Sequence, residues 1–155
     1  MGVFGPYLTH DYATPWGTAV NFDGRDSGGV REWAIQNACM WVRDYHADGL
    51  RVDAVHAIHD HTARHVMAEL CDRASRAAPR ETVLIAESDL NDPRVVTATA
   101  EGGWGFDAQR ADDFHHALHA RPTGDRDGCY GDFGPRAHPP ARTARPLVYA
   151  GRYSA

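Results

Sequence analysis

The sequence predicts an α/β domain built on a parallel sheet. Its periodic segments follow the order helix, strand, helix, strand, and the stretches between the strands are long enough for the crossovers of βαβ units. The run TVLIA at residues 82–86 is an uninterrupted strand-like segment, which is typical of parallel strands buried on both faces. With 155 residues, 43% of them hydrophobic and 24% charged, the chain is of ordinary size and composition for a globular domain.

The first part of the chain predicts a long loop followed by a helix. Residues 1–27 are rich in glycine, proline, aromatic and aspartate residues, and no helical or strand period is visible in them. Loops of this length inside compact domains are usually functional, so we expect an active-site loop region. From Val30 to Tyr45 apolar residues recur at helical spacing, with Ser27 as a plausible N-cap and an expected end near His46.

The middle of the chain carries the strands. A short apolar run from Leu50 to Val55 predicts a buried strand, and a helix is expected over about 62–77 before the strand at 82–86. That helix should turn four apolar side chains inward: Val66, Met67, Leu70 and Cys71. A weaker strand is possible over 103–109, and residues 112–120 look like the start of a further helix.

The end of the chain differs in composition. Several prolines stand close together after Gly124, and closely spaced prolines cannot propagate a helix. The expected organisation is therefore a loop region at 1–27, an α/β unit at 28–123, and an irregular proline-rich segment at 124–155.

Charge and composition exclude several classes of partner. The formal net charge is −5, so no basic face for nucleic acid is expected. The chain has neither a run of 18 apolar residues nor a signal-peptide pattern, so we expect no membrane association. Its three cysteines, Cys39, Cys71 and Cys129, are odd in number and widely spaced, which favours a reducing compartment and a cytoplasmic location.

Acidic residues stand at the carboxyl ends of both predicted strands. Asp53 and Glu87 occupy these positions, and in a parallel sheet such ends line the ligand crevice. Arg51 lies two residues before Asp53, so both side chains should leave the strand on one face, and the guanidinium should lower the pKa of Asp53. Glu87 has apolar neighbours in sequence, so its pKa should be raised. Such a pair suits glycoside hydrolysis, although either acid alone could be a solvated strand-end residue.

Two motifs carry a family resemblance. DGLRVDAVHAI at 48–58 resembles the nucleophile strand of the α-amylase superfamily, glycoside hydrolase family 13, and LIAESD at 84–89 resembles the next motif of that superfamily, which holds the acid/base glutamate. Longer strings are similar to its maltooligosyltrehalose trehalohydrolase family: FGPYLTHDYATPWGTAVNFDG (4–24), AESDLNDPRVV (86–96), DDFHHALHA (112–120), GCYGDFG (128–134) and LVYAGRYS (147–154).

The resemblance implies a (β/α)8 TIM barrel of which this chain would supply an incomplete segment, about strands 3 or 4 to 6. A complete barrel of this kind needs about 250 residues. The superfamily's earlier Asn-His motif and its later Asn-His-Asp motif, which carries a third carboxylate, are both missing from the sequence. On the resemblance, the chain is therefore expected to be an internal fragment of the catalytic barrel.

The resemblance also implies a reaction and a site. The enzyme would cleave the α-1,4 bond next to the terminal trehalose of maltooligosyltrehalose by a retaining double displacement, with Asp53 as nucleophile and Glu87 as proton donor. It implies no cofactor or metal, and a maltooligosaccharide-type substrate. Further substrate-binding positions are Arg51, which would orient the nucleophile, His56, and the cleft residues Asp113, His115 and His116. Tyr12, Trp16 and Trp104 are candidates for stacking on sugar faces, with ordinary packing as the alternative for each.

Three other interpretations remain open from the sequence. The cluster His56, His59, Asp60 and His61, followed by His65, has ligand types that suit a metal-dependent hydrolase. A barrel segment that lacks the third carboxylate could be catalytically inactive. The superfamily could also be right and the member different, namely a glycogen-branching or debranching enzyme, although the DDFHH and HDYATPWG strings argue against it.

Overall fold

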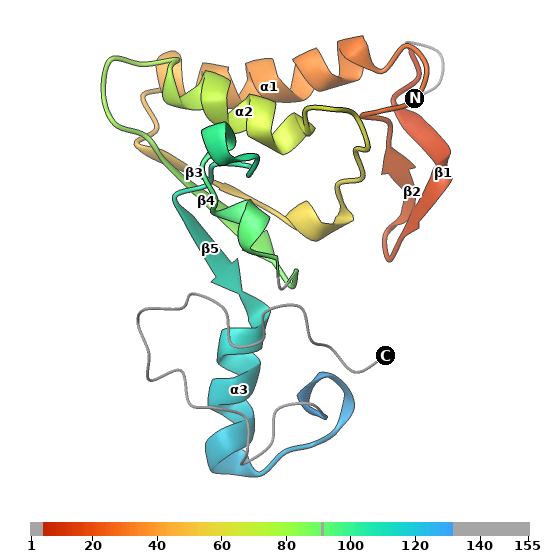
Figure 1. Cartoon of the computed structure of the whole chain (residues 1–155), viewed down its shortest axis with the longest axis vertical. Coiled ribbons are helices and arrows are strands. Elements are labelled where there is room, and N and C mark those ends of the chain that lie inside the picture. The colour runs from red at the N-terminus through yellow and green to blue at the C-terminus, as the bar shows by residue number, and fades with distance from the viewer. Residues whose placement is uncertain (1–4, 91, 132–155) are drawn as a thin grey trace.

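The computed structural model describes residues 5–90 and 92–131. Two helices, α1 (Gly28–Arg43) and α2 (Val66–Ser75), lie side by side over a small sheet (Figure 1). A hairpin precedes α1 on one side, and helix α3 (Asp112–Thr123) extends away from the sheet directly after its last strand (Figure 1). The described part of the chain is therefore a layer of helices on a sheet with one appended helix.

The central sheet is parallel, as the sequence predicts. It contains β3 (Gly49–Val52), β4 (Val83–Ser88) and β5 (Ala108–Ala111) in the order β3-β4-β5. Both strand pairs are parallel, and α2 lies between β3 and β4 in the chain, which makes a βαβ unit. The fold class is thus confirmed as α/β, with the order of elements found in part of a (β/α) barrel.

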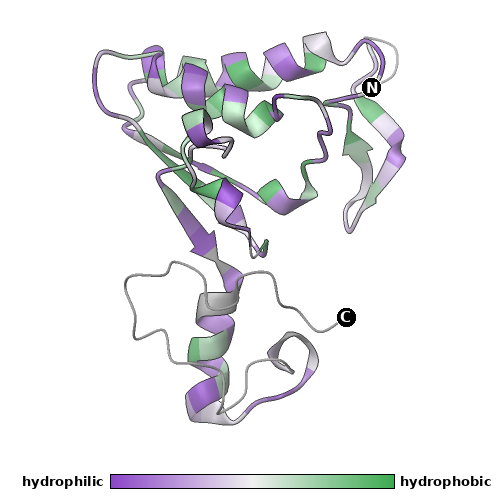
Figure 2. Cartoon of the chain, in the orientation of Figure 1, coloured by the Kyte–Doolittle hydropathy of each residue, from purple (hydrophilic) through white to green (hydrophobic). Residues whose placement is uncertain are grey.

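One face of the sheet is covered and the other is open. Leu84, Ala86 and Ser88 of β4 are buried on the face toward the helices, where the core also contains Ile35 of α1 and Met67 of α2. The alternate residues of β4 are more exposed, as the period of a strand requires. Figure 2 shows hydrophobic residues in α1, α2 and β4, and hydrophilic residues along β5. Side chains on the open face are therefore free to form a polar site.

The two core helices follow the predicted periods with shifted ends. Ser27 is the N-cap residue of α1, although its side chain makes no capping hydrogen bond. The helix ends at Arg43, before the expected His46, which has a left-handed φ of 58°. Helix α2 begins at Val66, and the Nδ1 atom of His65 accepts a hydrogen bond of 3.2 Å from the backbone N–H of Met67. The four residues predicted to face inward from α2 are buried.

The prediction that residues 1–27 form a loop without strands is wrong. β1 (Leu8–Thr14) and β2 (Gly17–Val20) form an antiparallel hairpin, with a turn at Pro15 and Trp16. Its register shifts between Thr9 and Ala13, and this irregularity removes the alternation by which a strand is detected in sequence. The next strand prediction is right in kind but displaced, because β5 covers 108–111 and not 103–109.

The last described elements form a second, small cluster. α3 begins directly after β5, and Ala117 and Ala120 pack against Tyr130 of the short 3-10 helix η4 (Gly128–Tyr130). The short 3-10 helices η1 (Val55–Ala57), η2 (Pro93–Val95) and η3 (Thr99–Glu101) complete the structure. Most of the segment predicted to be irregular, 132–155, lies outside the described residues. Within residues 5–90 and 92–131, no helix is long and apolar enough to cross a membrane.

An ion pair that links α1 to α2 predicts a loss of stability in acid. Both guanidinium NH groups of Arg73 donate to the Glu32 carboxylate, at 2.6 and 2.7 Å, and this hydrogen bonding lowers the pKa of Glu32 to about 2. Because the pKa is lower in the folded state, the stabilisation is present above pH 4.5 and is lost as the pH falls toward 2. We expect Glu32→Gln to reduce the thermal midpoint at neutral pH and to reduce it less below pH 3, measured by circular dichroism.

The control for this prediction is Glu101→Gln, because Glu101 is an exposed glutamate at the end of the short 3-10 helix η3, away from the contact between α1 and α2. Its thermal midpoint should follow that of the unmodified chain at every pH. A deficit for Glu32→Gln that stays constant from pH 7 to pH 2 would contradict the pH-dependent role of the Glu32–Arg73 pair.

Candidate active site

Asp53 and Glu87 lie opposite each other at the carboxyl ends of neighbouring strands. The parallel register pairs Val52 with Ala86, so the next residues along both strands, Asp53 and Glu87, are also opposite each other. Ala86 faces the helices, and alternation therefore directs Glu87 to the open face of the sheet. The prediction that these two acids meet at one edge is consistent with this geometry.

Arg51 connects the two acids. Its Nη2 atom lies 3.2 Å from Oδ1 of Asp53 and also contacts Oε1 of Glu87 as an ion pair. The two carboxyl groups share a hydrogen bond, and the backbone N–H of Ala54 also donates to Glu87. The Asp53 side chain is 76% exposed, whereas that of Glu87 is 17% exposed. The more accessible acid is thus the one expected to be the nucleophile.

A second arginine was not predicted from the sequence. Arg110 of β5 donates a hydrogen bond of 2.5 Å from Nη1 to Oε1 of Glu87. The register of β4 and β5 places Arg110 directly opposite Glu87. The signal that could have identified it was this alternation, but the sequence places the strand several residues too early. Glu87 is therefore flanked by one arginine on each side of its strand.

The expected directions of the two pKa shifts are wrong for this structure. The pKa of Asp53 is raised, first by its hydrogen bond to Glu87 and then by the negative charge of Glu87. The pKa of Glu87 is lowered, first by the hydrogen bond from Asp53 and then by Arg51. Sequence neighbours misled the prediction, because Arg51 contacts both acids and the two acids contact each other. Both pKa shifts are therefore opposite in direction to those expected from the sequence.

The segment after Asp53 carries His56 to the edge of the site. Ala54 has a left-handed φ of 46°, an uncommon conformation for a residue with a side chain, and the chain then enters η1. His56 lies in η1, with Nδ1 3.4 Å from Oδ1 of Asp89, the second residue after Glu87. The ring of Trp16, at the tip of the hairpin, lies 6.1 Å from the His56 ring and is largely exposed. His56 and Trp16 therefore lie together beside the acids.

The other two aromatic candidates are held elsewhere. The hydroxyl of Tyr12 donates to Oδ2 of Asp23 at 2.7 Å, and this hydrogen bond raises the pKa of Tyr12 to about 12. Its ring stacks on those of His59 and His61, at centroid distances of 4.8 and 5.4 Å. In this structure the Tyr12 ring, which was expected to stack on a sugar, therefore stacks on two histidine rings.

Trp104 is not a sugar-stacking residue in this structure. It is 8% exposed, and its ring stacks on that of His65 at a centroid distance of 4.2 Å. The expectation is corrected because a side chain buried in the core presents no free face to a ligand. Trp104 serves the alternative role considered for it, namely ordinary packing.

The residues predicted to line the cleft from α3 lie at the helix start, beyond the carboxyl end of β5. His115 pairs with Asp112 at 3.2 Å, and the His116 ring packs edge-on against Tyr130 at 5.4 Å. Asp113 belongs to the same turn, but its side chain is outside the described residues. These positions lie at the same carboxyl edge of the sheet as the two acids. The ion pair of His115 and the ring contact of His116 join them to Asp112 and Tyr130, which belong to α3 and η4.

The metal-binding alternative is not supported by the arrangement of its residues. The buried Asp60 accepts hydrogen bonds from Arg31, from the backbone N–H of Thr62 and from that of Val66. No group of three or more His, Cys, Asp and Glu side chains in the described ranges 5–90 and 92–131 is arranged to hold a metal ion. Asp60 is therefore a structural anchor for the loop, and the proposed cluster does not converge.

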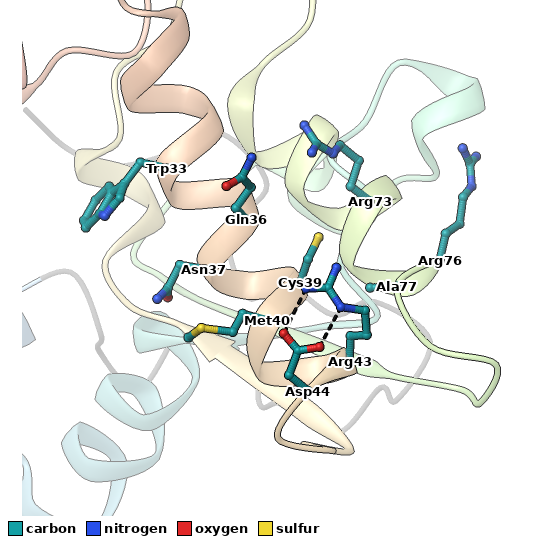
Figure 3. Close-up of a pocket in the computed structure, with 10 residues that line it drawn as sticks. All are labelled: Trp33, Gln36, Asn37, Cys39, Met40, Arg43, Asp44, Arg73, Arg76 and Ala77. Carbon is teal, nitrogen blue, oxygen red and sulfur yellow. Dashed lines mark hydrogen bonds and ion pairs between the residues drawn. The ribbon is translucent and has the colours of Figure 1, made fainter.

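A large surface groove lies away from the acids. It has a volume of about 720 Å³ and is formed by residues near the carboxyl ends of α1 and α2, including Cys39, Arg43 and Arg73 (Figure 3). These helix ends lead toward the amino ends of β3 and β4, whereas Asp53 and Glu87 lie at the carboxyl ends. The groove is therefore distinct from the candidate active site.

A solved structure resembles the chain in fold and sequence. It is the crystal structure of a candidate α-amylase from Salmonella typhimurium, with a TM-score of 0.73 and 32% identity, and the match covers 84% of this chain and 22% of that one. This match and the parallel sheet are consistent with the fold of part of an α-amylase-type (β/α) barrel.

The sequence relatives are more specific. A malto-oligosyltrehalose trehalohydrolase from Saccharolobus solfataricus is 43% identical over 99% of this chain, and one from Arthrobacter ramosus is 52% identical over 84% of it. No family model matches the chain. The chain is similar to part of these two trehalohydrolases, and it spans about a quarter of their length, 27% and 23% respectively.

Proposed function

We propose that the chain carries the nucleophile and the acid/base of a retaining glycoside hydrolase that releases trehalose from maltooligosyltrehalose. The observation that carries the proposal is the pairing of Asp53 and Glu87 at neighbouring strand ends, with Arg51 in contact with both. The names of the two relatives described above support the substrate, since both are malto-oligosyltrehalose trehalohydrolases. The bond cleaved is the α-1,4 linkage next to the terminal trehalose.

In the proposed double displacement Asp53 is the nucleophile, and Glu87 acts first as an acid and then as a base. An Asp53 oxygen attacks the anomeric carbon to form a glycosyl-enzyme, while Glu87 protonates the leaving oxygen. Glu87 then takes a proton from water, and this water releases the sugar with its original anomeric configuration. Arg51, which contacts both acids, orients the Asp53 carboxylate for its attack.

Substrate entry would change the protonation of the pair. Retaining glycosidases hold their two carboxyl groups about 5–5.5 Å apart, with the sugar between them. Here the groups share a hydrogen bond, and this bond is the largest cause that raises the pKa of Asp53 and lowers that of Glu87. A sugar ring that separates the acids removes that bond, so the pKa of Asp53 falls and that of Glu87 rises. Both changes favour the reactive state.

Sugar binding is assigned to the residues around this pair. Trp16 is exposed beside His56, so its indole face is accessible to an apolar sugar face. His56 supplies ring nitrogens next to Asp89 for sugar hydroxyls. We assign Asp113, His115 and His116 to the far side of the cleft, since α3 begins at the carboxyl end of β5.

The proposal is tested by the products formed from two substrates. Maltooligosyltrehalose and the unmodified maltooligosaccharide of equal length are incubated with the purified chain and with a chimera. In the chimera, this chain replaces its matching segment in the Arthrobacter ramosus relative. Free trehalose from the first substrate, with little hydrolysis of the second, is the expected result for the chimera. A folded chimera that hydrolyses both substrates equally would refute the trehalose specificity, and one that hydrolyses neither would refute the activity.

One observation favours a second candidate, an inactive barrel segment. The sheet has an open face, and Asp53 is exposed on it, whereas hydrolytic carboxylates work in a site from which water is largely excluded. Absence of products with the isolated chain, together with activity of the chimera, would assign this role to the chain on its own. We also propose a cytoplasmic setting, supported by the buried free thiols of Cys39 and Cys71.

A further inference from the structure

Glu87 is contacted by arginines from both neighbouring strands. Arg51 reaches Oε1 from β3, and Arg110 reaches the same oxygen from β5, with 2.5 Å between its Nη1 atom and Oε1. The pairing of Glu87 with Arg110 in the strand register sets this approach, so it does not depend on a flexible loop. Two guanidinium groups on one carboxylate oxygen form a strongly cationic environment for an acid that has to carry a proton.

The two arginines have different neighbours. Arg51 also contacts Asp53, so its charge is divided between the two acids. Among the residues that the structure describes, Arg110 forms an ion pair with Glu87 and with no other acid. The charged and polar groups that face Glu87 are thus Arg51 from β3, Asp53 and the backbone N–H of Ala54 directly after β3, and Arg110 from β5. Of the two cations, Arg110 is the one that acts on Glu87 without also holding the nucleophile.

We propose that Arg110 is a positioning residue that holds Glu87 in its ionised form and thereby limits its use as a proton donor at neutral pH. The effect on Glu87 follows from the ion pair alone, and its consequence for turnover rests on the proposed function. A cation within about 4–6 Å lowers the pKa of a carboxyl group by about 1–3 units. A proton donor works best with a pKa near the operating pH, so Arg110 opposes that role.

The direct test measures the titration of Glu87 in the isolated chain. The carboxyl carbon of Glu87 is followed by NMR from pH 2 to pH 8 in the unmodified chain, in Arg110→Gln and in Arg110→Lys. We expect Arg110→Gln to raise the titration midpoint by about one unit or more. Arg110→Lys keeps the positive charge, so its midpoint should stay close to that of the unmodified chain.

The matched control is Arg43→Gln. The side chains of Arg43 and Arg110 are 59% and 53% exposed, and each pairs with one acidic residue, but Arg43 lies on α1 and pairs with Asp44. This control should leave the Glu87 midpoint unchanged. If Arg110→Gln does not fold, Arg110→Met offers a second uncharged side chain of similar length. A folded uncharged variant with an unchanged Glu87 midpoint would overturn the proposal.

Activity of the chimera gives a second, separable readout. In Arg110→Gln the alkaline limb of the pH–activity profile should move to higher pH by the same amount as the titration midpoint of Glu87 in NMR. Each pH unit of that shift gives about tenfold more protonated Glu87 at neutral pH. An NMR shift with no activity in any chimera would sustain the role of Arg110 and refute the proposed function. An NMR shift in an active chimera whose alkaline limb stays in place would overturn the inferred limit on proton donation.

Discussion

Replacement of Glu87 by glutamine is expected to lower trehalose release by the chimera by about 10²–10⁴-fold, because a general acid/base contributes on that order to a rate. Glutamine keeps the size of the side chain but has no proton to give to the leaving oxygen. Asp53→Asn is expected to have an effect at least as large, since it removes the nucleophile that forms the glycosyl-enzyme. Initial rates of trehalose release, measured at saturating substrate, give both effects.

Asp26→Asn is the matched control for Asp53→Asn. Both aspartate side chains are 76% exposed, and each forms an ion pair with a nearby arginine, Arg25 for Asp26 and Arg51 for Asp53. The control changes the same functional group at equal exposure, so its rate should stay within twofold or so of the parent, as expected for a surface site. Trehalose release at near-parent rates by a folded Asp53→Asn chimera would remove Asp53 from the mechanism.

Loss of the buried Arg31–Asp60 ion pair is expected to have the largest effect on stability. Asp60 is completely buried at its side chain, and Nη1 of Arg31 lies 2.5 Å from its Oδ2 atom. Arg31 also donates to Glu69 and to the backbone carbonyls of Phe22 and Arg64, so it joins α1, α2 and the loop between them. Arg31→Met should lower the free energy of unfolding by about 3–5 kcal/mol, because it leaves the Asp60 charge buried without its cation.

Urea unfolding followed by circular dichroism measures this loss, with Arg94→Met as the control. Arg94 pairs with Asp92 at the surface, and its side chain is mostly exposed, so its removal should cost no more than about 1 kcal/mol. The double variant Arg31→Met/Asp60→Asn removes the uncompensated charge and should be more stable than Arg31→Met. If the single variants have additive effects, the Arg31–Asp60 pair does not have the proposed energetic role.

The helices and the first two strands of the parallel sheet could be predicted because their signals are local. Apolar spacing places α1 and α2, and a short apolar run places β4, each within a few residues. The hairpin at 8–20 was missed because a register shift interrupts its alternation. Its detection needed the pairing partner and not only the strand itself.

The candidate site was predictable in its members but not in its electrostatics. Asp53, Glu87 and Arg51 are adjacent to or within strand motifs, so their meeting follows from a parallel register. Arg110 comes from a strand with a weak signal, and its contact with Glu87 depends on the neighbouring strand's register. Likewise, Trp104 could be identified as an aromatic residue, but only the packing of His65 against it shows that it is buried. Contacts between strands and burial are non-local, and a single sequence does not contain them directly.

The four charged residues that meet at the edge of the three-stranded sheet come from one continuous stretch of chain, which runs from Arg51 to Arg110 and includes Asp53 and Glu87. The proposed nucleophile, the proposed proton donor and the two arginines that contact Glu87 would therefore be transferred together in any exchange of this segment between genes. A recombination event would transfer the acid pair with its own electrostatic setting, and the recipient barrel would supply the walls of the cleft. Selection would then act on the substrate through the residues that line the cleft. It would act on the pH range of activity through Arg110, independently of the substrate.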